Sequence, residues 1–351
     1  MRRVIPLLGL SALLPNSEDM RVVDLRIYPV KSCGGISLTS SRMAPTGLSW
    51  DRTLAVVDNE GNIQTQRQKR RLATIRPSLD LEAGTITLNG NGVDPLRVPL
   101  RGCEAEGCQR SFAQQGGGAR VRDMPIWLYP RAASEWLTRI LAGSPGVSID
   151  GDERPGKQEE RFHLVRWDET AGYSRRVMDN VGGDNARPED VVAFPDLYPL
   201  LVTTRESLEE VNRRVPDLEV GMERFRPNIV VTGSPEAFDE DKWAVVEVGE
   251  NGRVLTLRCL ESDPRCQVPS IDQQTGEKHP QLEPSRTLRG FRRVFDPFGK
   301  AGVLARAGPM FGVYAAHGGQ PGEVHVGDAV RVVERSDAGS LHEYWSRRGA
   351  K

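Results

Sequence analysis

Residues 21–35 read RVVDLRIYPVKSCGG, and this stretch sets the character of the fold. VVDLRIYPV alternates apolar with polar positions and is rich in β-branched residues, which is typical of a strand with one buried face. KSCGG then forms a turn that places Lys31 and Ser32 before two glycines. An ammonium, a hydroxyl and glycine-exposed backbone amides can together hold an anion such as a phosphate. A surface hairpin with a solvated lysine is the alternative.

Short strands separated by turn residues continue outward from this stretch. The sequence predicts a hairpin from residues 53–57 (TLAVV) and 63–66 around the turn 58–61 (DNEG). It predicts a second hairpin from residues 78–82 and 85–88. The first hundred residues therefore predict a curved sheet or barrel. A second β-rich unit is predicted from strands at 200–204, 228–232, 243–248, 254–259, 303–305, 311–315 and 329–333.

Helical patterns are few. Residues 132–141 (AASEWLTRIL) place their large apolar side chains on one helical face, and residues 204–215 predict a helix capped by Thr204. The polar, Gly- and Pro-containing stretch 144–185 reads as a loose linker. We therefore expect a mixed α+β, β-rich fold divided into a leader or weak anchor (1–20), an N-terminal domain (21–185), a second domain (186–335) and a tail (336–351).

Composition narrows the functional classes. A chain of 351 residues is long enough for about two domains, and 27% charged residues with 38% hydrophobic residues indicate a globular protein. The net charge of −1 gives no sign of nucleic-acid binding. Positive charge is bunched at RQKRR (67–71) and at four later arginines, which form either a docking patch for an acidic partner or a solvated face: Arg286, Arg289, Arg292 and Arg293.

The cysteines and the N-terminus bear on location. Five scattered cysteines without a CxxC pair argue against a disulfide framework and favour a reducing, intracellular compartment. The apolar run 5–14 is too short to cross a hydrocarbon core about 30 Å thick, which needs about 20 helical residues. It is a weak anchor, a targeting remnant or a frayed leader, so membrane contact is expected only through the N-terminus.

Cys266 lies in the segment 261–276, ESDPRCQVPSIDQQTG. Cysteine binds metal as its thiolate, and the neighbouring guanidinium of Arg265 favours that charged form. Pro264 and Gly276 would constrain the loop on either side. The segment is suited to metal ligation, although a lone cysteine in a chain of this size is more often a buried small hydrophobe.

Two further polar motifs lie directly before predicted strands. Arg52 in LSWDR precedes TLAVV. It either forms a salt bridge within its own sheet or offers the paired N–H donors of its guanidinium to a phosphate or a ring carbonyl. Arg226 and Asn228 bracket a proline in FRPNIVV, and together they offer the donors and the acceptor that suit a heteroaromatic ring with amide-like edges. A turn with a capping asparagine is the alternative. None of the five histidines pairs by spacing with a nucleophile, although His279 follows the Cys266 loop closely.

Taken together and in this order along the chain, these motifs resemble the MOSC family, and specifically the eukaryotic amidoxime-reducing components. The matching motifs span about residues 21–334 and are YPVKSC, WDR before TLAVV, DNEGNIQTQRQ, FRPNIVVTG, the RC-x4-ID-x2-TG loop, MFGVY and VHVGDAV. The resemblance implies an N-terminal MOSC-type β-barrel domain and a C-terminal MOSC β-barrel domain. It also implies a molybdenum cofactor, with Cys266 as the metal's thiolate ligand and as the catalytic residue.

The resemblance further implies roles for six neighbours of that thiol. Lys31, Ser32, Arg52, Arg226 and Asn228 would hold the pyranopterin and its phosphate, and Arg265 would support the loop. The implied activity is reduction of N-hydroxylated compounds (amidoximes, hydroxylamines, N-hydroxy bases), with electrons from a b5-type cytochrome and its NADH-dependent reductase. The implied location is the mitochondrial outer membrane or the cytoplasm.

The alternative is a cofactor carrier or a sulfurase-like MOSC module without reductase turnover. MOSC modules also form part of molybdenum cofactor sulfurases, in which pyridoxal phosphate binding belongs to a separate domain. This chain has no room for such a domain.

Overall fold

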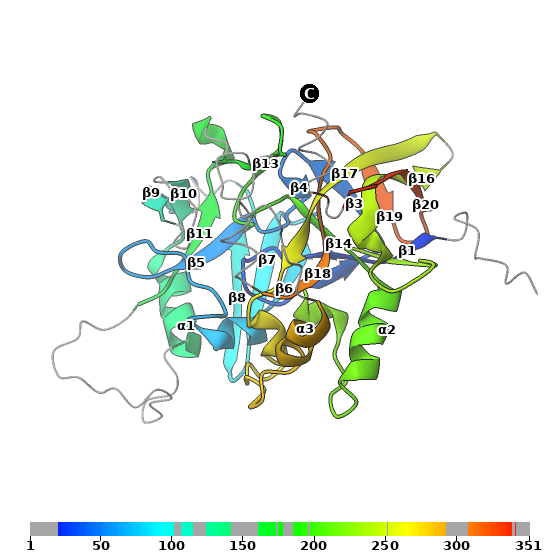
Figure 1. The fold of residues 1–351 in the computed structure, drawn as a ribbon. Helices are drawn as coiled ribbons and strands as arrows, with labels where there is room; N and C mark the ends of the chain where they lie inside the picture. Colours follow the sequence, from blue (N-terminus) through cyan, green and yellow to red (C-terminus); the bar gives the residue numbers. More distant parts are fainter. Residues whose placement is uncertain are drawn as a thin grey trace, which may run out of the picture.

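The computed structural model describes residues 20–101, 107–114, 124–141, 161–172, 175–177, 185–195, 197–250, 252–292, 308–338 and 341 (Figure 1). Within these residues the chain is β-rich and has three α-helices, which confirms the predicted mixed α+β class with few helices. Residues 1–19 of the leader, the tail beyond Leu341, the proposed strand 303–305 and parts of the stretch 144–185 lie outside the described residues. No helix in the described part of the chain combines the length and apolarity needed to cross a bilayer.

The larger sheet has eight strands in the order β2-β1-β15-β14-β18-β17-β16-β20. Their bounds are β1 (Arg21–Ile27), β2 (Ile36–Leu38), β14 (Leu200–Thr204), β15 (Ile229–Thr232), β16 (Trp243–Glu250), β17 (Arg253–Pro264), β18 (Met310–Ala316) and β20 (Val330–Arg335). Among the described strands of this sheet, only β14 and β15 pair in parallel. Their connection contains α2 (Arg205–Arg214), as a parallel crossover requires.

The ends of this sheet meet, so that it closes into a barrel. Arg21 at the start of β1 forms an antiparallel bridge with Ala329, just before β20. On either side, the Gly327 N–H donates to the Val22 carbonyl and the Val330 N–H donates to the Met20 carbonyl, each at 2.8 Å. Closure leaves fewer unpaired edges and encloses an apolar core.

Alternating side chains fill the barrel. Leu25, Leu257 and Val313 are fully buried, and each contributes about 1.5–3 kcal/mol through apolar burial. The buried indole of Trp243 keeps a partner, because its N–H donates to Asp239 Oδ2 at 2.8 Å. The alternation seen in the sequence therefore corresponds to an inward face and an outward face.

The N-terminal half adds a four-stranded sheet in the order β5-β11-β10-β9 and a three-stranded meander β6-β7-β8. Their bounds are β5 (Leu54–Val57), β6 (Arg76–Asp80), β7 (Thr85–Gly90), β8 (Val93–Pro99), β9 (Gln109–Ala113), β10 (Met124–Leu128) and β11 (His163–Trp167). Helix α1 (Arg131–Leu141) contacts β11 and β8 (Figure 1). The buried side chains of Trp136, Leu137 and Ile140 face this second core.

Two local expectations are extended by the structure. The hairpin predicted within 53–66 is present but short, because the Gln64 N–H donates to the Val56 carbonyl at 2.7 Å and the Asp58 N–H donates to the Asn62 carbonyl at 3.0 Å, on either side of the antiparallel bridge Val57–Ile63. The longer pairing of β5 is with β11, through four residue pairs. The stretch 144–185 is not merely a linker, because it contains β11 and the short strand β12 (Arg175–Arg176). The partner of β5 lies more than a hundred residues away, and a local pattern gives no indication of such pairing.

The remaining elements connect these sheets. Two small sheets consist of β19 (Glu323–His325), β3 (Ser40–Ala44) and β4 (Gly47–Leu48), and of β12 with β13 (Val191–Val192). Helix α2 begins as predicted, since the Thr204 hydroxyl accepts a hydrogen bond from the Ser207 N–H. Helix α3 (Ser285–Phe291) was not predicted. Short 3-10 turns lie at Arg70–Thr74, Glu169–Ala171, Met222–Arg224, Asp239–Lys242 and Val268–Ser270.

Candidate functional site

Four connecting segments meet where the barrel joins the N-terminal sheet. They follow β1, precede β5, precede β15 and follow β17. A parallel bridge between Val30 and Leu54 joins the first two, and the Lys31 N–H donates to the Leu54 carbonyl at 2.8 Å. The site is therefore built on strand ends, where rigid sheets fix the positions of loop residues.

All seven side chains predicted from the sequence line one cavity at this junction. Its empty space is ≈ 720 Å³, including the part that opens to solvent. The seven are Lys31, Ser32, Arg52, Arg226, Asn228, Arg265 and Cys266. The structure thus brings them together, while the role of each stays a prediction.

Cys266 lies on a constrained loop directly after β17. Its side chain is half-buried, and its Sγ accepts a hydrogen bond from the Val268 N–H at 3.5 Å. The Arg265 N–H donates to the Pro309 carbonyl, and a Cβ at Gly308 would meet the Arg265 carbonyl oxygen at 1.8 Å. Because only glycine fits there, the neighbouring chain packs closely against the loop and limits its movement.

Arg226 is a buried cation with an unused donor. Its Nη1 donates to the Cys33 carbonyl at 2.6 Å, and its guanidinium carbon lies 4.2 Å from the centre of the Tyr28 ring. Its buried Nη2 has no hydrogen-bond partner. Burial, reinforced by the charge of Arg52, lowers the pKa of Arg226 to about 10, so the side chain remains charged at neutral pH. A buried donor without a partner is costly, and an anionic ligand would supply that partner.

Arg265 presents a second donor of this kind. Its Nη1 pairs with Asp263, its Nη2 donates to the Phe225 carbonyl at 2.8 Å, and its buried Nε has no partner. Burial alone would lower the pKa of Arg265, but the interactions with neighbouring groups, Asp263 foremost, together outweigh it and raise the pKa. Arg265 therefore remains a cation beside the thiol.

Arg52 and Asn228 organise the floor of the site. Arg52 Nη1 donates to Asp51 Oδ2 at 2.5 Å and to Asn228 Oδ1 at 3.2 Å, and its Nη2 donates to the Arg226 carbonyl at 3.0 Å. Asn228 also accepts from the Leu201 N–H at 3.1 Å and donates to the Arg26 carbonyl at 3.1 Å. Arg52 thus has the salt-bridge partner that was expected, Asp51, and it also lines the cavity, while its role towards a ligand stays a prediction.

Several residues in or next to the cavity lining have strained backbone conformations. Ser32, Arg52 and Arg226 have φ values of 67°, 48° and 59°, and Trp50 next to Arg52 has 69°. Non-glycine residues rarely adopt this left-handed region, and such conformations concentrate at ligand-binding sites. This observation is independent of the motifs that singled out these residues.

The wall of the cavity is electropositive. Its cationic residues are Lys31, Arg52, Arg67, Arg226 and Arg265, and its one lining carboxylate is Asp263. The ammonium of Lys31 is buried and donates to the Phe194 carbonyl at 2.7 Å, which fixes its position. This balance of charge favours an anionic ligand.

Several residues of the cavity wall were not predicted from the sequence. Gln66, Arg67 and Tyr314 lie within motifs that carry the resemblance, but no role in this site was predicted for them. Tyr198, whose ring centre lies 5.1 Å from that of Tyr314, was not indicated by any motif. His279 is not among the lining residues, and its Nδ1 accepts from the Glu283 N–H at 3.3 Å.

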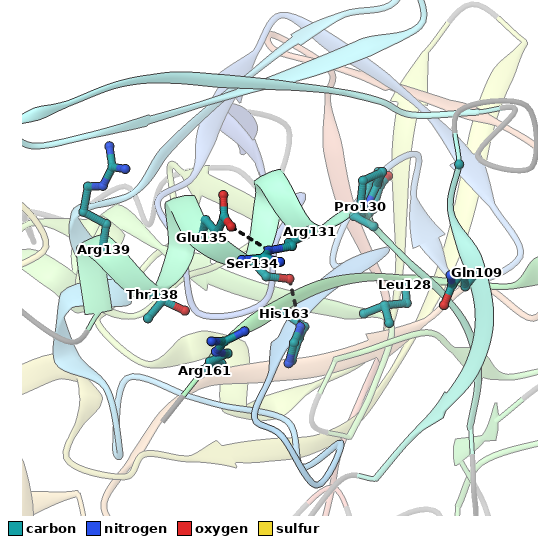
Figure 2. A pocket seen from close by; sticks show the side chains of 12 residues that line it. Gln109, Leu128, Pro130, Arg131, Ser134, Glu135, Thr138, Arg139, Arg161 and His163 are labelled. Carbon is teal, nitrogen blue, oxygen red and sulfur yellow. Dashed lines mark hydrogen bonds and ion pairs between the residues drawn. The ribbon is translucent and has the colours of Figure 1, made fainter. Parts of the chain in front are cut away.

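A larger cavity lies between α1, β10 and β11, with ≈ 1380 Å³ of empty space on the same measure (Figure 2). Ser134 Oγ and His163 Nδ1 are hydrogen-bonded there at 2.8 Å, and burial lowers the pKa of His163. Arg131 forms an ion pair with Glu135 at 2.7 Å at its rim. None of the seven predicted residues lines this cavity, so the larger cavity and the cluster of predicted residues are in different places.

Three members of the basic clusters are engaged within the fold. Lys69 Nζ lies 5.0 Å from the centre of the Phe162 ring, and Arg71 Nη1 donates to the Ile140 carbonyl at 3.3 Å. Arg292 forms an ion pair with Asp241 at 2.6 Å. These contacts serve the structure, whereas exposed Arg67 lines the cavity.

Comparison with known proteins agrees with this two-part architecture. A family model described as the MOSC N-terminal beta barrel domain matches residues 19–144, and one described as the MOSC domain matches residues 189–331. Together they define a protein with both parts in the expected order.

Relatives extend over nearly the whole chain. "Mitochondrial amidoxime-reducing component 1" of Homo sapiens is 29% identical over 89% of this chain and 82% of its own length. "Mitochondrial amidoxime reducing component 2" of Macaca fascicularis and of Rattus norvegicus are each 30% identical over 88% of this chain and 82% of their own. The chain belongs to the MOSC family and, within it, is a relative of the amidoxime-reducing components.

Among solved structures, the YUAD protein from Bacillus subtilis is 10% identical. The match covers 89% of this chain and 93% of that chain with a TM-score of 0.32. A score this low carries no argument about fold or function.

Proposed function

We propose that this chain is a molybdenum cofactor-dependent oxidoreductase that reduces N-hydroxylated compounds such as amidoximes, hydroxylamines and N-hydroxy bases. The observation that carries the proposal is one electropositive cavity that joins a half-buried thiol to two buried arginine donors without partners. Family membership supports it, because the named relatives are amidoxime-reducing components.

The residues present fit a pyranopterin with its phosphate. Arg226 Nη2 and Arg265 Nε need acceptors, which a phosphate or a ring carbonyl provides. Lys31, Ser32 and Arg52 add further donors on the same wall, and Asn228 holds Arg52 in place. Cys266 would supply the metal's protein ligand through Sγ, with the Val268 N–H and the Arg265 charge beside the sulfur.

When bound, the cofactor supplies the redox chemistry that takes an N-hydroxy compound, two electrons and two protons to an amine and water. The chain's part is to hold the cofactor's negative charge, to fix the sulfur ligand and to admit substrate at the half-buried thiol. Electrons would arrive singly from a b5-type cytochrome and its NADH-dependent reductase, since the sequence has no GxGxxG motif for a nicotinamide.

Replacing Cys266 by serine tests the proposal. Cys266→Ser should lower benzamidoxime turnover by more than about 100-fold with reconstituted electron donors, since groups that only orient metal ligands already contribute 10–100-fold. Its thermal unfolding should match that of the parent protein, because serine differs little in size. Cys108→Ser, which alters a half-buried thiol outside this cavity, is the matched control and should keep full activity.

Molybdenum content and pterin fluorescence separate the outcomes. Close to one molybdenum per chain with turnover supports a reductase, whereas pterin without turnover supports a carrier or sulfurase-like module. Full turnover in Cys266→Ser would remove Cys266 from the site.

A further inference from the structure

Two buried glutamines form a reciprocal pair beside the cavity. Gln66 Nε2 donates to Gln273 Oε1 at 2.9 Å, and Gln273 Nε2 donates to Gln66 Oε1 at 3.1 Å. Gln66 is 1% exposed and Gln273 is 5% exposed. The pair joins the loop after β5, where Gln66 lines the cavity, to the loop that begins at Cys266.

The remaining N–H group of each amide is also used. Gln66 Nε2 donates to the Ser32 carbonyl at 2.8 Å, and Gln273 Nε2 donates to the Ile271 carbonyl at 3.1 Å. Arg76 donates to the Gln273 carbonyl and fixes the backbone at that point. A fully satisfied buried network holds its members in one arrangement, because any displacement leaves polar groups unpaired.

This pair therefore connects the three segments that carry Ser32, Arg67 and Cys266, all of which line the same cavity. A second tie supports the same loop, since Arg224 pairs with Asp272 at 2.8 Å and donates to the Pro269 carbonyl at 3.4 Å. Loss of the glutamine pair should consequently loosen the thiol loop on one side without unfolding it.

We propose that Gln66 and Gln273 are positioning residues that set the location of the Cys266 sulfur relative to the cationic wall. The catalytic meaning of that location rests on the proposed function. The restraint on the thiol itself does not, because the amide pair consists of protein groups alone. Neither residue is expected to touch substrate.

Alkylation of the cofactor-free full chain measures the restraint directly. We expect Gln66→Leu and Gln273→Leu each to accelerate modification of Cys266 by iodoacetamide, followed by peptide mass, on the order of fivefold. This magnitude corresponds to the loss of one or two neutral hydrogen bonds. The double variant should react no faster than the faster single variant, because both substitutions break the same pair.

Gln64→Leu is the matched control. Gln64 is a glutamine two residues from Gln66, and its Nε2 donates to Asp58 Oδ2 at 2.9 Å and to the Asn62 carbonyl at 3.0 Å, within its own turn. It should leave the alkylation rate unchanged. Parent-like rates in both single variants, equal acceleration by Gln64→Leu, or a multiplied effect in the double variant would each overturn the proposal.

The loaded enzyme gives a second measurement. Both single variants should keep their molybdenum content while kcat falls several-fold and KM changes little, as expected when a ligand is misplaced and substrate binding is preserved. Unchanged kcat with accelerated alkylation would contradict the positioning role in catalysis. A parent protein without molybdenum or turnover would instead contradict the proposed function, and the alkylation rates would still decide whether the pair restrains the thiol.

Discussion

Arg226 is a buried cation whose contacts within the fold leave one of its donors unused. Desolvation of a guanidinium costs several kcal/mol, and the bond to the Cys33 carbonyl with the contact to the Tyr28 ring offsets part of that cost. Its backbone at φ 59° adds strain that an ordinary structural arginine would not need. The unpaired Nη2 leaves part of that cost without compensation inside the protein, and the proposed cofactor would supply the missing acceptor.

Removal of this side chain should therefore act on cofactor binding. We expect Arg226→Ala to weaken molybdenum cofactor binding about 10- to 100-fold, the range typical of groups that support a metal site. Arg226→Lys should recover only part of the occupancy, because an ammonium lacks the planar fork. Metal analysis of purified protein measures both, and unchanged molybdenum in Arg226→Ala would contradict the assignment.

Arg214→Ala is a suitable control for that experiment. Arg214 is 40% exposed and pairs with Glu210 at 2.5 Å on helix α2, away from the cavity lining. A surface ion pair of this kind contributes little to stability. Its loss should leave metal content unchanged.

At the level of single residues, the sequence indicated the site through chemistry and local position. Cys266 and Arg226 could be recognised from local sequence, because Cys266 follows Pro264 by two residues at the end of a strand and Arg226 stands beside Pro227 just before one. Tyr198 and the partnership of Gln66 with Gln273 could not, because their importance depends on contacts between distant segments. Alternation and motif spacing contain no information about such contacts.

At the level of elements, a buried carboxyl joins helix α2 to the turn Asp239–Lys242. Glu240 accepts hydrogen bonds from the Ser207 hydroxyl at 2.8 Å and from the Thr204 hydroxyl at 3.0 Å. Burial, with the neighbouring charge of Asp241, raises the pKa of Glu240 to about 7. The carboxyl that ties these elements together therefore carries its proton in the folded protein at mildly acidic pH.

This raised pKa predicts a defined dependence of stability on pH. Below the unfolded pKa of about 4.3 the carboxyl is protonated in both states, and its stabilising contribution is complete. As the pH rises towards about 7, the unfolded chain ionises first, so the contribution is lost progressively and then stays constant.

Glu240→Gln should remove this dependence. The free energy of unfolding of the variant, relative to the parent, should rise between pH 5 and pH 8 by up to a few kcal/mol, at about 1.4 kcal/mol per unit of pKa shift. Urea unfolding at several pH values measures the difference. Parallel curves for the two proteins would show that the pKa of Glu240 does not differ between folded and unfolded states.

The sequence predicted the bounds of some helices and strands well, but it did not predict how all the strands pair. Helices α1 and α2 and the barrel strands β14 to β17 begin or end close to their predicted positions, because caps and alternation are local signals. The pairing of β5 with β11 was not predicted, since His163–Trp167 is short and lies in a polar stretch. Sheet order depends on long-range contacts that no window of sequence contains.

At the level of the whole molecule, the first strand belongs to the barrel formed by the second half of the chain. Strand β1 pairs with β15 and closes the barrel against the start of β20. The chain then leaves the barrel directly into the loop of Lys31 and Ser32. Closure of the barrel therefore also places these two cavity-lining residues.

A fragment of residues 186–351 should therefore fail to fold on its own. It lacks β1, whose Val22, Leu25 and Ile27 side chains are buried in the barrel core and contribute about 1.5–3 kcal/mol each. It would also leave the edge of β15 unpaired. Near-ultraviolet circular dichroism and thermal unfolding should show no cooperative transition.

Supplying the missing strand should reverse that defect. Residues 20–38 joined to residue 186 through a flexible Gly/Ser linker contain β1 and β2, and we expect this fusion to unfold cooperatively. The same fusion with Leu25→Asp is the matched control, because a carboxylate at a fully buried barrel position prevents closure. A cooperative transition in the unfused fragment, or equal folding of the Leu25→Asp fusion, would show that the barrel does not depend on its first strand.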